Sequence, residues 1–138
     1  MIYFIDTNIF LRVLVQDDIK LAKDCIQLLK NVKEGKLKAV TNSLVLAEIV
    51  WTLQSFYKLS KRQTVRALKG ILNLKGLTIR DQYNPQDAIF IYEKRKVKYI
   101  DAAIASIEQI MAKKWIIISY DADFDKLSVI RKEPKEVI

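Results

Sequence analysis

Short apolar runs alternate along the chain with longer segments in which apolar residues recur at helical spacing. The short runs cover residues 1–5, 37–41, 77–79 and 115–120, and most are rich in β-branched or aromatic residues, as buried strands are. The longer segments cover residues 17–33, 42–57, 60–76, 84–96 and 100–113. Strands that alternate with helices predict an α/β sandwich around a mainly parallel sheet.

Polar residues and glycines support the boundaries of these helices. The expected first-turn or capping residues are Asp17 and Asp18, Asn42 or Ser43, Ser60, and Asn84 with Pro85. Gly35 and Gly76 are placed to end two helices. In the segment 60–76, we expect an apolar side formed by Val65, Leu68, Ile71 and Leu72.

Three further segments complete the chain. Residues 9–15 form a short apolar segment, and residues 121–127 a loop or a short turn of helix. The tail from residue 128 is expected to add an edge strand.

Two carboxylates directly follow predicted strands. Asp6 comes after residues 1–5, and Asp121 after residues 115–120. In an open parallel sheet, ligands bind at the carboxyl ends of the strands, so both side chains are expected at one edge. Asp also initiates turns after strands, but two matched strand ends favour a site.

Two more carboxylates lie in predicted helices. Glu48 is the only charged residue between Lys38 and Lys58, and it belongs either to a site wall or to a solvated polar stripe. Asp101 is either a first-turn carboxylate favoured by the helix dipole or an acid held against the sheet edge by close packing of a following alanine run.

Composition limits the chemistry. The 138 residues are 51% hydrophobic and 29% charged, which predicts one folded domain spanning residues 1–138. No histidine and only Cys25 are present, so histidine-based triads and zinc or iron–sulfur sites are excluded. The three glycines fit neither a Walker A loop nor a dinucleotide fingerprint. Clustered carboxylates then point to Mg²⁺ or Mn²⁺, which would offset the repulsion between them.

Charge indicates the kind of partner. The net charge of +8 favours a polyanion such as nucleic acid. Candidate phosphate contacts, each of which could instead be a solvated surface side chain, are Arg12, Lys58, Lys61, Arg62 and the basic residues of 94–98. Cys25, the single cysteine, is expected to be a small core residue. The lack of a second cysteine, the absence of a signal-peptide pattern and the charged and polar residues within 39–57 predict a cytoplasmic protein with no membrane span.

With these residues identified, the chain resembles the PIN-domain family, and in particular VapC-type toxin ribonucleases. The similar motifs, in family order, are Phe4-Ile-Asp-Thr-Asn-Ile9, Leu46-Ala-Glu-Ile49, Tyr99-Ile-Asp-Ala-Ala-Ile-Ala105 and Ser119-Tyr-Asp-Ala-Asp-Phe124. The resemblance covers nearly the whole chain.

The resemblance implies a single Rossmann-like three-layer sandwich that cleaves single-stranded RNA with Mg²⁺ or Mn²⁺, forms a homodimer and is blocked by an antitoxin protein. Carried over by position, the acidic metal-holding set is Asp6, Glu48, Asp101 and Asp121, with Asp6 and Asp101 as direct ligands. Thr7, Asn8 and Ser119 are expected to support the site by hydrogen bonding, and either Asp121 or Asp123 to complete it. One metal or two are both compatible with this set.

Three functions follow as hypotheses. The first is a metal-dependent endoribonuclease, either a toxin or a PIN nuclease of RNA processing without an antitoxin. The second is a PIN-like module that binds nucleic acid without cleaving it, although clustered acids would repel a polyanion. The third, an aspartyl-phosphate phosphatase, would require a second Asp at position 8, where the chain has Asn8.

Overall fold

A parallel sheet forms the centre of the molecule. The computed structural model describes residues 1–138 and contains one five-stranded sheet in the order β3-β2-β1-β4-β5. The strands are β1 (Ile2–Ile5), β2 (Lys38–Thr41), β3 (Leu77–Ile79), β4 (Trp115–Ile118) and β5 (Arg131–Lys132). Every neighbouring pair is parallel, with Ile5 opposite Ile118 at the ends of β1 and β4. The predicted α/β fold with a parallel sheet is therefore confirmed.

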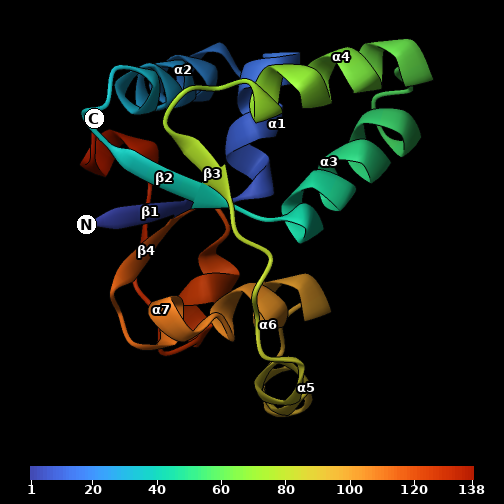
Figure 1. The fold of residues 1–138 in the computed structure, drawn as a ribbon. Coiled ribbons are helices and arrows are strands. Elements are labelled where there is room, and N and C mark those ends of the chain that lie inside the picture. Colours follow the sequence, from blue (N-terminus) through green and yellow to red (C-terminus); the bar gives the residue numbers. More distant parts are fainter.

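Helices cover both faces of this sheet (Figure 1). The helices are α1 (Thr7–Val15), α2 (Ile19–Lys33), α3 (Ser43–Ser55), α4 (Lys61–Leu72), α5 (Pro85–Lys94), α6 (Tyr99–Ala105) and α7 (Glu108–Met111), with 3₁₀ segments η1 (Ala122–Lys126) and η2 (Pro134–Glu136). In Figure 1, α1, α2 and α4 lie above the sheet, and α5, α6 and α7 lie below it. The chain thus forms three layers.

Local signals set most helix starts as predicted. The side chains of Asp18, Asn42, Ser60 and Asn84 each accept a backbone N–H of the first turn of the helix that follows. These bonds satisfy backbone donors that have no partner within the helix. The positions of α2, α3, α4 and α5 therefore follow from residues that can be identified in the sequence.

The core lies where the two central strands meet the helices. Phe4 and Ile5 of β1 and Ile117 and Ile118 of β4 have no exposed surface. Cys25 of α2 is also fully buried, as predicted for a small core residue. Its burial raises the pKa of the thiol to about 11, so the thiol stays protonated at neutral pH.

The last predicted helix is interrupted. Residues 100–113 were expected to form one helix, but α6 ends at Ala105 and α7 begins at Glu108. The hydroxyl of Ser106 donates to the carbonyl of Ala103 at 2.7 Å, and Ile107 has ψ 125°, which is outside the helical region. This break lets both Ile107 and Ile110 enter the core, where each is at most 1% exposed.

Smaller differences concern α1, α4 and β4. The apolar segment 9–15 belongs to a helix, α1, that begins at Thr7. In α4, Val65 and Leu72 are exposed and Thr64 is buried, so the predicted apolar side was partly wrong. β4 ends at Ile118, two residues before the predicted end. The N–H of Ser119 still donates to Lys132 of β5, but the N–H of Tyr120 donates to the side chain of Asn8 and not to a strand.

The tail adds the expected edge strand, β5, although this strand contains only Arg131 and Lys132. None of the helices combines the length and the apolar character that crossing a bilayer requires.

Candidate active site

The end of β1 places Asp6 at the carboxyl edge of the sheet. Its backbone N–H continues the ladder to β4 by donating to the carbonyl of Ile118 at 3.1 Å. Its side chain turns back and accepts the N–H of Thr7 at 2.8 Å, which caps α1. Asp6 is only 4% exposed, so the strand end and the helix start together fix a buried carboxylate.

Ser119, directly after β4, is the centre of a hydrogen-bond network. Its hydroxyl donates to Asp6 Oδ2 at 2.6 Å and accepts from Asn8 Nδ2 at 2.9 Å and from the N–H of Asp121 at 3.0 Å. Asn8 also donates to Asp6 Oδ2 at 3.1 Å and accepts the N–H of Tyr120 at 3.1 Å. The network connects the residues that follow β1 with those that follow β4.

The predicted acids share one pocket at this edge. Asp6, Glu48, Asp101 and Asp121 all line a cavity of about 350 Å³. Glu48 comes from α3, Asp101 from the first turn of α6, and Asp121 from the start of η1. Ala102, Ala103 and Ala105 are buried, which agrees with the close packing expected beside Asp101. The fold therefore gathers all four carboxylates from distant parts of the sequence.

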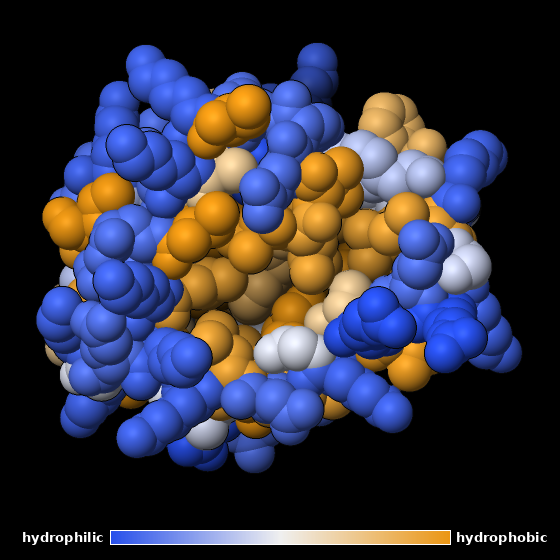
Figure 2. Space-filling model, turned by 90° about the horizontal axis from the view of Figure 1, so that it is seen from above, coloured by the Kyte–Doolittle hydropathy of each residue, from blue (hydrophilic) through white to orange (hydrophobic).

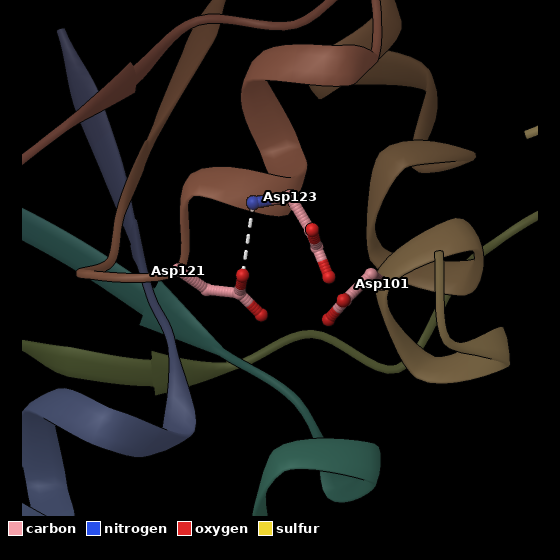
Figure 3. A group of neighbouring side chains, drawn as sticks. All are labelled: Asp101, Asp121 and Asp123. Carbon is pink, nitrogen blue, oxygen red and sulfur yellow. Dashed lines mark hydrogen bonds between the residues drawn. The ribbon is translucent and has the colours of Figure 1, made fainter. Parts of the chain in front are cut away.

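Asp123 joins the edge of this cluster. Carboxylate oxygens of Asp101, Asp121 and Asp123 lie within 4.8 Å of one another, and Figure 3 shows Asp101 on α6 pointing toward the other two. Asp121 accepts the N–H of Asp123 at 2.9 Å (Figure 3). Asp123 also pairs with Lys126 at 2.8 Å and is absent from the pocket lining. Asp101 and Asp121 thus belong to both groups of acids, whereas Asp125 pairs with Arg131.

Lys98 brings the only lysine ammonium into the pocket lining. Its Nζ lies 3.9 Å from Glu48 and 4.0 Å from Asp121. Burial lowers the pKa of Lys98, but the charges of Asp101, Glu48, Asp121 and Asp6 outweigh that effect and raise it overall. The ammonium therefore offsets part of the negative charge of the pocket.

The acids are held at an energetic cost. Burial raises the pKa of Asp6 to about 6, although the hydrogen bonds from Ser119 and Thr7 oppose the shift. Burial also raises the pKa of Asp101 to about 7; nearby Lys98 lowers it, and the neighbouring carboxylates raise it further. Two buried acids with strongly raised pKa values in one pocket are typical of functional sites.

Comparison with known proteins agrees with this geometry. The family profile of the PIN domain matches residues 3–130. The chain belongs to the PIN-domain family. No curated protein matches the sequence.

Solved structures share the fold of this PIN domain. VapBC2 of Rickettsia felis, bound to a DNA fragment from its promoter, is 21% identical with a TM-score of 0.67, covering 96% of this chain and 98% of that one. VapC20 of Mycobacterium tuberculosis, a sarcin–ricin loop cleaving toxin, is 15% identical with a TM-score of 0.66, covering 93% and 96%. VapBC-1 of nontypeable Haemophilus influenzae is 19% identical with a TM-score of 0.62, covering 98% and 99%.

The donor set of the PIN domain fits a hard divalent cation. Asp101 Oδ2 and Thr7 Oγ1 are buried without a hydrogen-bond partner, and both residues line the acidic pocket. Buried polar atoms are normally paired, so these two oxygens are free to accept a ligand at the pocket. Carboxylate and hydroxyl oxygens are the ligands that Mg²⁺ and Mn²⁺ prefer.

The predicted supporting residues differ in how they act. Ser119 and Asn8 form the side-chain bonds described above, whereas Thr7 contributes through its backbone N–H. Of the basic residues proposed to contact phosphate, only Lys98 lines the pocket. Arg12 pairs with Asp17 at 3.2 Å, and Lys58, Lys61 and Arg62 are exposed around the turn from α3 to α4. Their contact with RNA remains a prediction.

Leu11, Trp51 and Thr52 also line the pocket. Thr52 belongs to the polar stripe expected beside Glu48, whereas Leu11 and Trp51 were not predicted. Trp51 and Thr52 follow Glu48 by three and four residues in α3, so helical spacing puts all three on neighbouring positions of one face. That spacing was a usable signal for Trp51.

Proposed function

We propose that this PIN domain is a metal-dependent endoribonuclease that cleaves single-stranded RNA in the cytoplasm. The observation that carries the proposal is the convergence of Asp6, Glu48, Asp101 and Asp121 on one pocket, with an unpartnered buried oxygen on Asp101. Acids placed together at a cost in stability require a positive ligand to offset it. A shared fold with the RNA-cleaving toxin of M. tuberculosis supports a ribonuclease.

Each residue of the pocket has a proposed role that follows from its position. Asp6 and Asp101, the most buried acids, would hold Mg²⁺ or Mn²⁺ directly, with Glu48 and Asp121 completing the set. Such a cation supplies activation of water and stabilisation of charge on the phosphate. Ser119 and Asn8 fix the orientation of the Asp6 carboxylate. Lys98, which reaches Glu48 and Asp121, is placed to contact an incoming phosphate oxygen.

We further propose that the chain is the toxin of a VapBC-type pair. Two of the solved neighbours are VapBC structures, and this chain carries a surface suited to a protein partner. Figure 2 shows a hollowed apolar patch on the face that carries α1, α2 and α4, surrounded by hydrophilic residues. The corresponding groove of about 820 Å³ includes Phe10, Leu14, Leu29 and Ile71, with Lys30, Lys33 and Arg66 among its lining residues.

This groove fits an amphipathic antitoxin segment with acidic residues beside its apolar side. The apolar floor would bury the apolar side, and the basic residues would pair with the acids. Co-expression with the product of a small adjacent gene tests the assignment. A product that co-purifies and blocks cleavage supports the toxin; a cleaving enzyme without such a gene product supports a PIN nuclease of RNA processing.

Homodimerisation also remains a proposal. Ile89, Phe90 and Tyr92 of α5 are each more than half exposed, so α5 offers apolar side chains that a second copy could cover. The molar mass measured by light scattering on the purified chain tests this: the mass of a single chain at micromolar concentration contradicts the dimer.

The activity is tested by incubating the protein with end-labelled single-stranded RNA and Mn²⁺ or Mg²⁺. We expect cleavage that is lost with EDTA, in Asp6→Asn and in Asp101→Asn. Cleavage that survives both substitutions would show that this pocket is not the active site. RNA binding without cleavage and without metal dependence would favour the non-catalytic binding module.

A further inference from the structure

Trp51 is an unusual residue on the wall of the acidic pocket. It is 68% exposed, although tryptophan is one of the side chains that folding normally buries most. It lines the same cavity as the four carboxylates and follows Glu48 by one helical turn of α3. A large aromatic ring is therefore held in solvent beside the proposed reaction centre.

The other exposed aromatic residue of this region has a different environment. Phe56, at the end of α3, is 71% exposed, but its ring packs edge-on against Tyr57 with centroids 4.9 Å apart. Phe56 does not line the acidic pocket. The second tryptophan, Trp115, packs against the hydrophobic core. Trp51 alone combines an exposed ring with a place beside the acids.

We propose that Trp51 is a base-stacking residue that binds a nucleotide next to the scissile phosphate. This inference rests on the proposed ribonuclease function and extends it to substrate recognition. Aromatic rings bind unpaired bases by stacking, and every base offers a face for this contact. The acids and Lys98 provide the place for the phosphate, and Trp51 lies at the edge of that place.

The geometry also gives a reason for selecting single strands. In a duplex, the faces of the bases are covered by their neighbours, so a base must leave the stack before it can contact Trp51. An unpaired nucleotide avoids that cost. Stacking depends little on base identity, so Trp51 is expected to select the unpaired state more than the sequence.

The test measures RNA binding separately from cleavage. Asp101→Asn prevents cleavage, and Trp115→Phe leaves Trp51 as the only tryptophan, so its fluorescence reports on its environment. We expect a single-stranded RNA oligonucleotide to quench this fluorescence, and the same oligonucleotide with abasic sites to quench it much less. In the Asp101→Asn background, Trp51→Ala is expected to weaken binding about tenfold, because one stacked base contributes roughly that factor.

Two variants make the comparison specific. Trp51→Phe keeps an aromatic face and is expected to restore most of the affinity. Phe56→Ala removes an equally exposed ring from the same helix and is expected to leave RNA affinity unchanged. With Asp101 intact, Mn²⁺ affinity should be the same in Trp51→Ala and in the wild-type protein, which excludes damage to the acidic set.

Several outcomes would overturn the inference. Equal affinity of Trp51→Ala and its parent would remove the stacking role. A change in molar mass in Trp51→Ala would assign the ring to a contact between copies of the chain. If the wild-type protein cleaves RNA but Trp51→Ala binds it equally well, only this inference fails. If wild type neither cleaves nor binds RNA, the proposed function itself fails.

Discussion

At the scale of single residues, Asp101 shows the conflict between stability and function. It is 3% exposed, and one of its oxygens has no partner. Its folded-state pKa of about 7 exceeds the ordinary value of an aspartate, so protonation favours the folded state. This contribution to stability is complete below the ordinary pKa and is lost as the pH rises through about 7.

Asp101→Asn removes this buried charge and is therefore expected to raise the free energy of unfolding of the metal-free protein at pH 8 by about 2 kcal/mol. This figure is smaller than the free energy that corresponds to the full pKa shift. The gain should grow between about pH 4 and pH 7, where the buried carboxylate becomes charged. Urea denaturation at a series of pH values in EDTA measures it. An equal gain at pH 5 and pH 8 would show that the buried charge is not its cause.

Cation affinity should rise with pH over the same range in which the stability contribution of the protonated acids is lost. Asp6 and Asp101, with pKa values of about 6 and about 7, must lose their protons to hold a cation. We expect Mn²⁺ affinity to rise at least about tenfold between pH 6 and pH 8, as one group with a pKa near 7 requires. Calorimetric titration with Mn²⁺ tests this, and a flat profile would place the cation elsewhere.

Lys98 competes with the cation for the same acids. Its ammonium lies 3.9 Å from Glu48 and 4.0 Å from Asp121. Replacing it by a neutral side chain in Lys98→Gln is expected to raise Mn²⁺ affinity roughly tenfold, because one positive charge near the site is removed. Lys96→Gln, an equal charge change on an exposed neighbour, should leave the affinity unchanged. If Lys98→Gln and Lys96→Gln raise Mn²⁺ affinity by the same factor over wild type, the increase comes from the change in net charge and not from the position of Lys98.

The sequence predicted the carboxylates better than their neighbours. Asp6 and Asp121 could be found because each directly follows an apolar run in the sequence, and parallel pairing brings the ends of β1 and β4 together, although β4 itself ends at Ile118. Asp101 and Glu48 gave no comparable local signal, since a helical acid looks the same on a solvated face. Trp51 was missed because an aromatic residue in an apolar helix is normally a core residue, and its exposure depends on the whole fold.

At the scale of elements, helix caps could be predicted, whereas the end of β4 and the interruption between α6 and α7 could not. A cap depends on one side chain and the next few residues, so Asn42 and Ser60 are recognisable. The break at Ser106 depends instead on tertiary packing, because it lets both Ile107 and Ile110 be buried in the core. The inward face of α4 was partly wrong for the same reason, because only the packed sheet decides that Thr64 is buried.

The turn before β3 provides an element-scale prediction. Gly76 has φ +88°, and a Cβ there would overlap the carbonyl oxygen of Val32 at the end of α2 and lie 3.3 Å from Val32 Cγ1. Gly76→Ala is therefore expected to destabilise the protein by about 2 kcal/mol or more. Gly70, inside α4, has open space around it, so Gly70→Ala should stabilise by about 0.5–1 kcal/mol.

Thermal and urea denaturation of both glycine variants measures these effects. The two substitutions add the same methyl group. Changes of opposite sign in the free energy of unfolding would therefore show that the local backbone conformation and surroundings of each glycine are the cause. Destabilisation by Gly70→Ala would instead indicate that the α4 surface is covered in solution.

At the scale of the whole molecule, a net charge of +8 coexists with a pocket lined by acids. In the proposed ribonuclease, the basic exterior would attract RNA over a distance, and the pocket would accept it once a cation is bound. We expect RNA affinity of Asp101→Asn to fall steeply between 50 and 200 mM salt, as in binding driven by phosphate contacts. Fluorescence titration at several salt concentrations measures the slope, and a flat dependence would contradict a role for the basic surface.

The hydrogen bond from Ser119 to Asp6 joins residues 113 positions apart in the chain. A contact between residues so far apart in the sequence closes a long loop, which costs chain entropy and favours slow folding. It also cannot exist on a ribosome until Ser119 and Asp121 have been synthesised, at roughly 5–20 residues per second. A growing chain therefore carries Asp6 for most of its synthesis without a complete acidic pocket, so the proposed activity can begin only after the residues that follow β4 have been made.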